Sequence, residues 1–357
     1  MSFINAGTLQ RPGVAAPPAG GVLLVGEDAP GSLLASIRPG IESAVPTTVL
    51  NPRSAATSLV AKTGIVAAVR RRVAAHRSEQ RLIEAVAQLS PALVVLIKGR
   101  GIQASTIREI QTGGTPVACW YPDNPRWTGG DPGAQARLEA CEIPILWSQR
   151  QAASLASRVD RAEVLPFGYN PNWYELSPAG GDRSGIAFLG TWSHRRERFL
   201  SALDGLPVTI AGTGWKENSA IREVSDPIVE AEAGAILRRS VVGVNLLHPQ
   251  CAGAHNMRTR EICASGALQL TDPGTDGTPL SDGDGAMWFD SPQQLRELAE
   301  RALADPMWAT SHARRGQELI AADTYATRGR QLIELCGVAA SVAVTPVVRT
   351  KVQARVA

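Results

Sequence analysis

Hydrophobic and polar positions alternate along this chain in two recurring patterns. Short apolar runs are typical of strands buried on both faces, and longer stretches with apolar residues three and four positions apart are typical of amphipathic helices. The predicted strands lie at residues 22–26, 47–50, 92–98, 116–121, 143–147, 163–165, 185–190, 208–212, 241–247 and 267–270. Predicted helices begin at Ser32 and lie at residues 54–76, 79–89, 105–112, 195–203, 228–239, 256–265, 292–304 and 311–335. Strands separated by helices indicate right-handed crossovers and parallel sheets covered on both faces.

These elements fall into two sets, which predict two domains of the doubly wound α/β class. Residues 1–20, rich in Pro, Gly and Ala, are expected to form a loose tail, and residues 21–170 a first Rossmann-like domain. A linker at residues 171–184 leads to a second Rossmann-like domain at residues 185–337, and residues 338–357 form either a tail or a final strand. Because ligands of such sheets bind at the carboxyl ends of the strands, the expected site is a cleft between the domains.

Composition narrows the class further. A chain of 357 residues with 44% hydrophobic and 19% charged residues is typical of a two-domain globular protein, and a net charge of +3 is too small to indicate nucleic acid as the main partner. The longest apolar runs are far shorter than the about 18 residues of a membrane span, and the N-terminus lacks a signal-peptide pattern. The cysteines lack the spacing of a metal site or redox motif: Cys119, Cys141, Cys251, Cys263 and Cys336. We therefore expect a reduced, cytoplasmic enzyme without a metal or other cofactor.

The segment NMRTREICASGALQLTD combines a short charged helix with a buried strand. Asn256 is the predicted N-cap, and Gly266 is placed for a left-handed C-cap. Arg258 and Arg260 are cations near a helix N-terminus, where an anionic ligand such as a diphosphate would offset their unfavourable interaction with the helix dipole. Glu261 could accept hydrogen bonds from two sugar hydroxyls. The alternative, an exposed helix whose charges face water, stays open.

Small residues, cations and aromatic rings also follow other predicted strands. In the second domain these segments are Thr191-Trp192-Ser193-His194-Arg195-Arg196, Thr213-Gly214-Trp215-Lys216 and His248-Pro249. In the first domain they are Lys98-Gly99-Arg100-Gly101 and Tyr121-Pro122-Asp123-Asn124-Pro125. Glycine permits close backbone approach, cations neutralise phosphate, and a Trp face can stack on a base or sugar. Asp123 and Asn124 can bind hydroxyls and Asp123 could act as a base, whereas a tight polar turn is the alternative.

Several other motifs indicate no further site. No Gly-x-Gly-x-x-Gly follows the first strand and no Walker lysine motif occurs, so a dehydrogenase or a P-loop NTPase would lack its phosphate-binding element. Asp282 and Asp284 lack the remaining ligands of an EF-hand loop and predict a polar turn. The basic helix that contains Arg70, Arg71, Arg72 and Arg77 predicts a solvated face, with weak peripheral contact to an anionic membrane as the alternative.

Five segments together resemble a known family. In this order, IKGRGI, WYPDNP, LPFGYNP, FLGTWSHRRERFLSAL and NMRTREICASGALQLTD resemble the spore-maturation (CgeB-like) glycosyltransferases, and the later part is similar to the nucleotide-sugar-binding half of group-1 glycosyltransferases. The resemblance covers residues 90–335 and implies a GT-B architecture, two Rossmann-like domains with the donor held mainly by the second. It also implies metal-independent transfer, in which protein cations stabilise the leaving diphosphate.

The resemblance assigns roles to individual residues. Glu261 matches the glutamate that holds the donor ribose, and Arg258 matches the arginine ahead of it. The other candidate donor-site residues are Gly190, Thr191, Trp192, Arg195, Arg196, Lys216 and Thr259. The acceptor-side candidates are Lys98, Gly99, Asp123 and Asn124, with Asp123 as the candidate catalytic base.

Two positions depart from the family pattern. Group-1 members have a second glutamate eight positions before the first, where this chain has Gly253, so the residue that faces the transferred sugar stays unassigned. Position 260, commonly aromatic in the family, is Arg260.

Two functions of different class follow. The favoured one is a glycosyltransferase that uses a nucleotide-diphosphate sugar, with a UDP-sugar as the expected donor and a glycan, protein or small molecule as acceptor. Whether the anomeric configuration is retained stays open. The alternative is an inactive relative that binds a nucleotide sugar or glycan, because fold alone does not separate an enzyme from a binding module.

Overall fold

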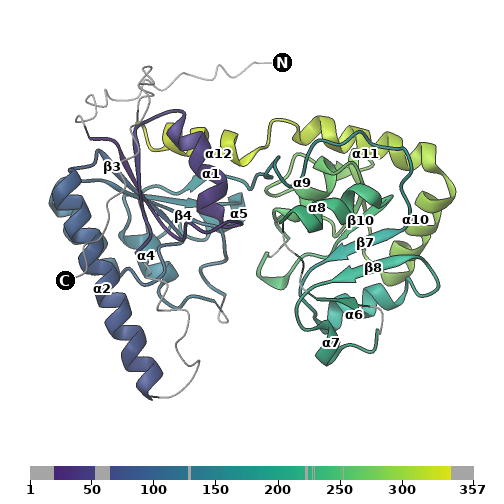
Figure 1. The fold of residues 1–357 in the computed structure, drawn as a ribbon, viewed down its shortest axis with the longest axis horizontal. Helices are drawn as coiled ribbons and strands as arrows, with labels where there is room; N and C mark the ends of the chain where they lie inside the picture. Colours follow the sequence, from purple (N-terminus) through teal and green to yellow (C-terminus); the bar gives the residue numbers. More distant parts are fainter. Residues whose placement is uncertain are drawn as a thin grey trace, which may run out of the picture.

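The computed structural model describes residues 20–52, 65–127, 130–221, 224–226, 228, 230–251 and 253–338. They form two α/β lobes side by side, each built around a parallel sheet (Figure 1). The two doubly wound domains predicted from the hydrophobic pattern are therefore confirmed.

The first domain contains a six-stranded sheet in the order β2-β1-β3-β4-β5-β6, with every neighbouring pair parallel. Its elements are β1 (Val22–Val25), α1 (Leu33–Glu42), β2 (Thr47–Leu50), α2 (Ile65–Leu89), β3 (Leu93–Ile97), α3 (Ala104–Thr112), β4 (Val117–Tyr121), α4 (Ala134–Ala140), β5 (Ile143–Leu146), α5 (Gln149–Ala153) and β6 (Glu163–Val164). Alternate strand residues point to opposite faces. One face packs against α2, α3 and α4, and the other against α1 and a helix from the far end of the chain.

The second domain contains a seven-stranded sheet in the order β12-β13-β11-β10-β7-β8-β9. Its elements are β7 (Ile186–Leu189), α6 (His194–Ser201), β8 (Val208–Ala211), α7 (Trp215–Asn218), β9 (Val224–Ser225), α8 (Glu230–Arg239), β10 (Val242–Asn245), α9 (Arg258–Ala264), β11 (Leu268–Thr271), β12 (Ser281–Asp282), β13 (Gly285–Trp288), α10 (Pro292–Ala304) and α11 (Pro306–Ile320). Apart from β12 this is the Rossmann strand order, and its direction reverses between β7 and β10. Helices α6 and α10 cover one face, and α8 and α9 cover the other.

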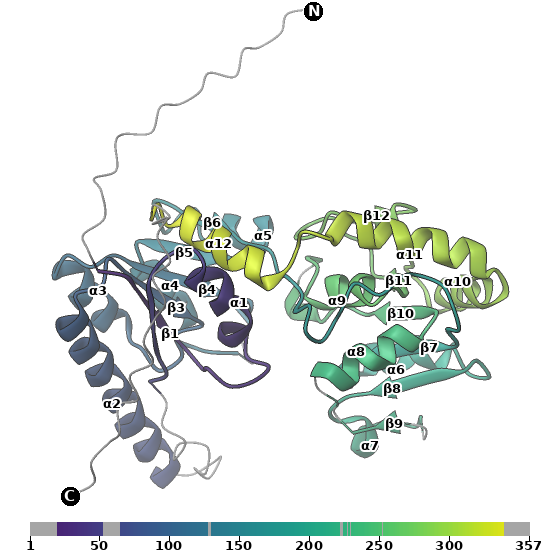
Figure 2. The same ribbon diagram turned by 45° about the horizontal axis from the view of Figure 1, so that its top comes forward.

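The last helix that the structure describes packs on the first domain. The single helix predicted at residues 311–335 is wrong, because the chain leaves helical geometry after α11 and restarts as α12 (Tyr325–Leu335). Figure 2 shows α12 beside α1 on the first lobe while α11 stays on the second. Glycine permits this close packing, since a Cβ at Gly329 would lie 2.4 Å from the Ile37 carbonyl oxygen. The predicted boundary of the second domain at residues 185–337 is corrected accordingly, because α12 completes the first-domain core.

Other boundaries shift in smaller ways. The two helices predicted at residues 54–76 and 79–89 are one continuous helix, α2, as far as the described residues extend. The predicted tails, except for residues 20 and 338, lie outside the described residues. The predicted linker at residues 171–184 is tied to the second domain, because Arg183 donates to the carbonyl oxygens of Gly180, Leu237 and Ser240.

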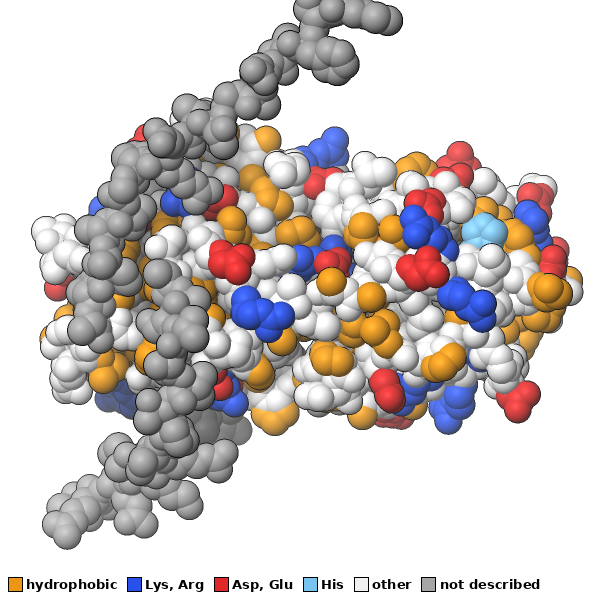
Figure 3. Space-filling view, turned by 90° about the horizontal axis from the view of Figure 1, so that it is seen from above, with side chains coloured by type: hydrophobic (Ala, Val, Ile, Leu, Met, Phe, Trp, Pro, Cys, Tyr) orange, Lys and Arg blue, Asp and Glu red, His pale blue; other side chains and the backbone are white. Residues whose placement is uncertain are grey.

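The predicted peripheral membrane contact involves four arginines: Arg70, Arg71, Arg72 and Arg77. Side chains at residues 70–72 lie outside the described part, and Arg77 is exposed. On the face seen in Figure 3, cationic and anionic side chains lie next to one another over the second lobe. Exposed pairs such as Arg315 with Asp284, 2.6 Å apart, are of this kind. Of the helices described, none combines the length and the apolarity that a membrane-spanning segment requires.

Candidate active site

A cavity of about 370 Å³ lies between the two domains. The first domain lines it with the carboxyl ends of β1, β3 and β4 and with the N-terminus of α1. The order of the first sheet reverses between β1 and β3, which is where ligands of doubly wound sheets bind. The second-domain side and the crossover segments supply the opposite wall: Asn170, Trp173, Tyr174, Met257, Glu261 and Tyr325. The cleft predicted between the domains is thus present.

Among the described residues of the second domain, Glu261 is the only carboxylate in the lining of this cavity. The residue is 8% exposed, and its Oε2 lies 2.7 Å from Nη1 of Arg258, one helical turn earlier. That contact is an ion pair rather than a well-aligned hydrogen bond, so Oε2 lacks a hydrogen-bond partner among the described residues. Burial raises the pKa of the carboxyl, and the positive charge of Arg258 partly opposes the rise. A buried carboxylate with unused acceptor capacity at a cavity wall can bind ligand hydroxyls.

Side-chain hydrogen bonds hold the N-terminal end of α9 in place. Its N-cap is Met257 rather than the predicted Asn256, whose side-chain oxygen instead accepts a hydrogen bond from the Asn245 amide at 3.3 Å. Thr259, a predicted donor-site residue, is fully buried, and its hydroxyl contacts Asn245 and Nδ1 of His255. Thr259 therefore holds the helix in place and does not face the cavity.

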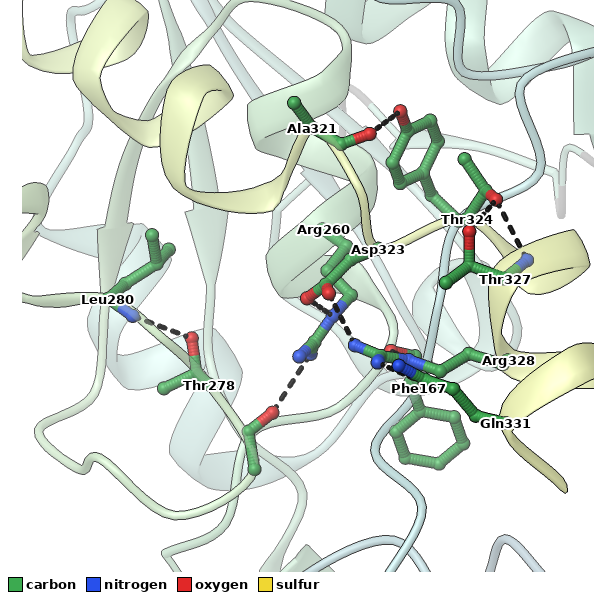
Figure 4. Close-up of polar contacts among 12 residues, drawn as sticks. Phe167, Arg260, Thr278, Leu280, Ala321, Asp323, Thr324, Thr327, Arg328 and Gln331 are labelled. Atoms are coloured by element: carbon green, nitrogen blue, oxygen red, sulfur yellow. Dashed lines mark hydrogen bonds and ion pairs between the residues drawn. The ribbon is translucent and has the colours of Figure 1, made fainter. Parts of the chain in front are cut away.

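Arg260 does not point at the site. Its side chain is 2% exposed and donates to Asp323 at 2.7 Å and to the Gly277 carbonyl oxygen at 2.9 Å (Figure 4). The expectation that Arg260 joins Arg258 at an anionic ligand is therefore wrong. Successive helix residues turn by about 100°, so positions 258 and 261 share a face while position 260 lies on another.

Four cations were predicted to meet the diphosphate, and each has a partner within the chain: Arg195, Arg196, Lys216 and Arg258. None of the four is among the residues that line the cavity. Arg195 forms a bidentate ion pair with Asp272, in which Nη1 and Nη2 each donate to one carboxylate oxygen. Arg196 is buried, donates to the carbonyl oxygens of Thr191 and Leu246, and so ties together the ends of β7 and β10. Burial lowers the pKa of Arg196.

Lys216 lies farther out on α7. Its side chain is 52% exposed, and Nζ pairs with an oxygen of Asp226 at 2.7 Å. This contact is weakened by solvent and leaves Lys216 available to other anions.

The predicted glycine-containing turn after β7 is a packing feature. The carbonyl oxygen of Gly190 accepts a hydrogen bond from the Trp215 indole at 2.7 Å, and a Cβ at Gly212 would lie 2.0 Å from the same oxygen. Trp192, in the same turn, donates its indole hydrogen to Glu197 at 3.0 Å. Close approach of two loops is therefore what these glycines permit here.

Lys98, Gly99 and Asp123 line the cavity from the first domain, as predicted for the acceptor side. Lys98 has a φ of +62°, which is unfavourable for a residue with a side chain. The Arg137 guanidinium holds this conformation by donating to the Lys98 carbonyl oxygen at 3.2 Å. In this geometry Nζ of Lys98 lies 2.9 Å from a carboxylate oxygen of Asp123. A strained residue held in place at a cleft is typical of functional sites.

Asn124 bridges the two domains instead of lining the cavity. Its amide donates to the Gln250 carbonyl oxygen at 3.1 Å. Nearby, the Trp127 ring meets the His248 ring edge-on with centroids 5.3 Å apart. Asn124 therefore fixes how the domains meet next to Asp123.

Several residues of the cavity wall were not predicted from the sequence, and two of them are tyrosines, Tyr174 and Tyr325. The Tyr174 hydroxyl accepts from Nη1 of Arg258 at 3.4 Å. A signal for Tyr174 existed, since Trp173 and Tyr174 interrupt an otherwise polar linker. Tyr325 lay inside a predicted amphipathic helix and gave no such signal.

Among the described residues, no group of three or more His, Cys, Asp or Glu side chains is placed to hold a metal ion.

Known proteins resemble this chain in sequence and in fold. Residues 195–334 match the family described as Glycosyl transferase-like, a range that spans most of the second domain and α12. No protein among curated sequences matches the chain.

Solved structures resemble both domains together. The Anabaena protein Alr3699/HepE in complex with UDP-glucose has a TM-score of 0.60 at 10% identity, covering 88% of this chain and 98% of its own. Sucrose-phosphate synthase from Thermosynechococcus elongatus has a TM-score of 0.58 at 12% identity, again with 88% and 98% coverage. UDP-GlcNAc 2-epimerase from Neisseria meningitidis bound to UDP-GlcNAc has a TM-score of 0.54 at 9% identity, with coverage of 88% and 98%. The fold is therefore GT-B, with two Rossmann-like domains.

Proposed function

We propose that this protein is a glycosyltransferase that moves a sugar from a nucleotide-diphosphate sugar, with a UDP-sugar as the expected donor, to an acceptor hydroxyl. The observation that supports the proposal best is the buried Glu261 carboxylate at the cavity wall, paired with Arg258 in a segment that matches the Glycosyl transferase-like family. Solved relatives of this fold bind UDP or UDP-glucose, which fits the same chemistry. The CgeB-like assignment and a cytoplasmic location remain predictions.

In this proposal Glu261 accepts hydrogen bonds from the ribose hydroxyls of the donor. The bond between the anomeric carbon and the diphosphate oxygen breaks, and the acceptor oxygen forms the new bond to that carbon. Negative charge develops on the leaving diphosphate, and in this proposal Arg258, whose Nη1 lies 2.7 Å from Oε2 of Glu261, turns toward the cavity to stabilise it. Arg195 contributes in this proposal by exchanging Asp272 for the diphosphate.

Asp123 is the proposed acceptor-side base. It lines the cavity and is held by Lys98 at 2.9 Å, a pairing that keeps the carboxylate oriented. A base must lie within hydrogen-bond reach of the acceptor hydroxyl whose proton it takes. The proposed acceptor is a hydroxyl group of a glycan, a protein or a small molecule.

The decisive experiment is incubation with a panel of nucleotide sugars and detection of the released nucleoside diphosphate. Release that depends on an added acceptor supports transfer, with the Glu261→Gln variant as the control. Conversion of the sugar nucleotide to an isomer without release would instead indicate an epimerase, a chemistry named for one relative of the same fold. Tight binding of nucleotide sugar without turnover would favour the alternative, a binding module.

One observation keeps that alternative under consideration. Gly253 stands where the wider family has its second glutamate. Its backbone is left-handed, with a φ of +87°. A Cβ added at this position would lie 3.6 Å from the Arg150 guanidinium. Among the described residues, the second-domain wall therefore offers one carboxylate to the sugar instead of two. The panel separates the two functions directly.

We also propose that transfer needs no metal ion. Cations of the chain would take the place of a divalent ion on the leaving diphosphate. Activity measured after treatment with EDTA should equal that of the untreated protein. Loss of activity with EDTA and its recovery with manganese would contradict this.

A further inference from the structure

Tyr325 reaches the cavity from an unexpected direction. It is the first residue of α12, so it belongs to the segment that returns from the second domain to the first. Its ring packs in the first-domain core, is 7% exposed, and lines the same cavity as Glu261. Burial raises the pKa of the Tyr325 phenol, and the negative charge of Glu261 raises it further. The phenol is therefore protonated at neutral pH and keeps a hydrogen to donate.

The segment just before Tyr325 is held by a buried cluster of charges, the Arg260–Asp323–Arg328 clamp (Figure 4). One carboxylate oxygen of Asp323 lies 2.7 Å from Nε of Arg260, and the other lies 2.6 Å from Nη2 of Arg328. The arginines come from α9 and α12, so the clamp joins the helix that contains Glu261 to the helix that contains Tyr325. Removing one partner of such a cluster leaves a buried charge uncompensated, which is costly.

Backbone hydrogen bonds hold the same segment. The Tyr169 amide donates to the Asp323 carbonyl oxygen at 3.0 Å, and the Tyr325 amide donates to the Tyr169 carbonyl oxygen at 2.9 Å. Arg328 donates from Nε to the Phe167 carbonyl oxygen at 3.1 Å. The two crossover segments between the domains thus run side by side and leave Tyr325 little freedom relative to Glu261.

We propose that Tyr325 is a donor-binding residue whose hydroxyl contacts the bound nucleotide sugar beside Glu261, and that Arg260, Asp323 and Arg328 are positioning residues that hold it there. This inference rests on the proposed function. Arg260, which departs from the family pattern and is the residue before Glu261, then has a role, because it helps to hold Tyr325 in place through Asp323. It also explains why a buried ion cluster lies at the crossover instead of apolar side chains.

The test uses the full-length protein and UDP as the probe, with calorimetric titration, steady-state kinetics and thermal unfolding. Tyr325→Phe keeps the ring and removes only the hydroxyl. We expect its melting temperature to stay close to that of the parent while the Kd for UDP and the KM for the donor rise about three- to tenfold, the effect of one lost hydrogen bond.

Asp323→Asn tests the clamp, with Asp284→Asn as its matched control, because Asp284 is also paired with an arginine but is exposed. We expect Asp323→Asn to lower the melting temperature and raise KM, and Asp284→Asn to change neither. In the double variant Tyr325→Phe with Asp323→Asn, KM should rise no further than in the worse single variant, because both changes act through one hydroxyl. If the clamp is purely structural, the fold increases in KM of the two single variants should multiply in the double variant, and this result would overturn the positioning role.

The outcomes separate this inference from the proposed function. If the parent binds UDP and turns over a nucleotide sugar while Tyr325→Phe matches it in Kd and KM, this inference alone is overturned. If the parent neither binds UDP nor releases a nucleoside diphosphate, the proposed function fails and takes the role of Tyr325 with it.

Discussion

Replacement of Glu261 by glutamine is the most direct test of the donor site. The substitution keeps the shape of the side chain and removes its charge, so contacts to the ribose hydroxyls lose their charge assistance. Hydrogen bonds to a charged group contribute about 1.5–3 kcal/mol, which predicts a Kd for UDP about 10- to 150-fold higher than that of the parent. Because Glu261 lies 2.7 Å from Arg258, the substitution also releases a cation that can turn to the diphosphate and reduce the loss.

Ribose analogues separate these two effects. In the parent, 2′-deoxy-UDP and 3′-deoxy-UDP should bind more weakly than UDP, because each lacks one hydroxyl that Glu261 would accept from. In Glu261→Gln the loss of affinity caused by removing either hydroxyl should be clearly smaller than in the parent, whatever Arg258 contributes, because the neutral amide oxygen forms weaker hydrogen bonds than a carboxylate. Calorimetric titration of both proteins with all three nucleotides measures the coupling directly.

The matched control is Glu300→Gln, which removes a glutamate that also lies one turn from an arginine, Arg296 at 2.8 Å, but on an exposed surface. UDP affinity should be unchanged in this variant. If the deoxy nucleotides lose the same affinity in Glu261→Gln as in the parent, Glu261 does not contact the ribose and the donor site must be reassigned.

Three further predictions address packing, pH and the acceptor side. Gly329→Ala should lower the unfolding free energy by about 1–3 kcal/mol, since the added methyl group would meet a backbone carbonyl; denaturation at or above the parent midpoint would refute this. Burial lowers the pKa of His255 from 6.5 to about 4. The neutral, buried imidazole therefore contributes its full share of the unfolding free energy above pH 6.5, and about 3 kcal/mol of this free energy is lost as the pH falls toward 4. Urea denaturation at pH 7 and pH 4.5 measures the loss, and a His255→Gln variant with the same pH slope would rule out His255 as the cause. Asp123→Asn should bind UDP normally but transfer sugar at least about 100-fold more slowly, and transfer at the parent rate would exclude Asp123 as the base.

The sequence predicted the elements well where burial alone determines them. Strands such as β3 and β4 are buried on both faces, so their apolar runs are nearly continuous and stand out from the helices around them. The division between α11 and α12 escaped prediction because the residues between them are compatible with a helix. A tertiary interaction ends the helix there, because Asp323 pairs with two arginines from different helices.

The candidate site was predicted in part. Glu261 and Asp123 line one cavity because carboxyl ends of parallel strands and the following helix face the same cleft. Arg196 and Arg260 were misjudged for a shared reason. A cation near a strand end or a helix head satisfies the sequence pattern equally well when its guanidinium binds backbone carbonyls or a buried carboxylate. Only the direction of the side chain distinguishes the cases, and tertiary packing determines it.

The return of α12 to the first domain has a consequence for how this protein is made. Leu332 and Ile333 complete the core that contains β1 and α1, so the first domain lacks part of its core while the second is being synthesised. At about 5–20 residues per second, a ribosome takes roughly 10–30 s to go from residue 170 to residue 335. Throughout that interval the side of α1 that α12 covers in the folded protein lacks this partner, although the same helix already packs against the sheet. The nascent first domain is therefore expected to need chaperone protection until α12 has emerged.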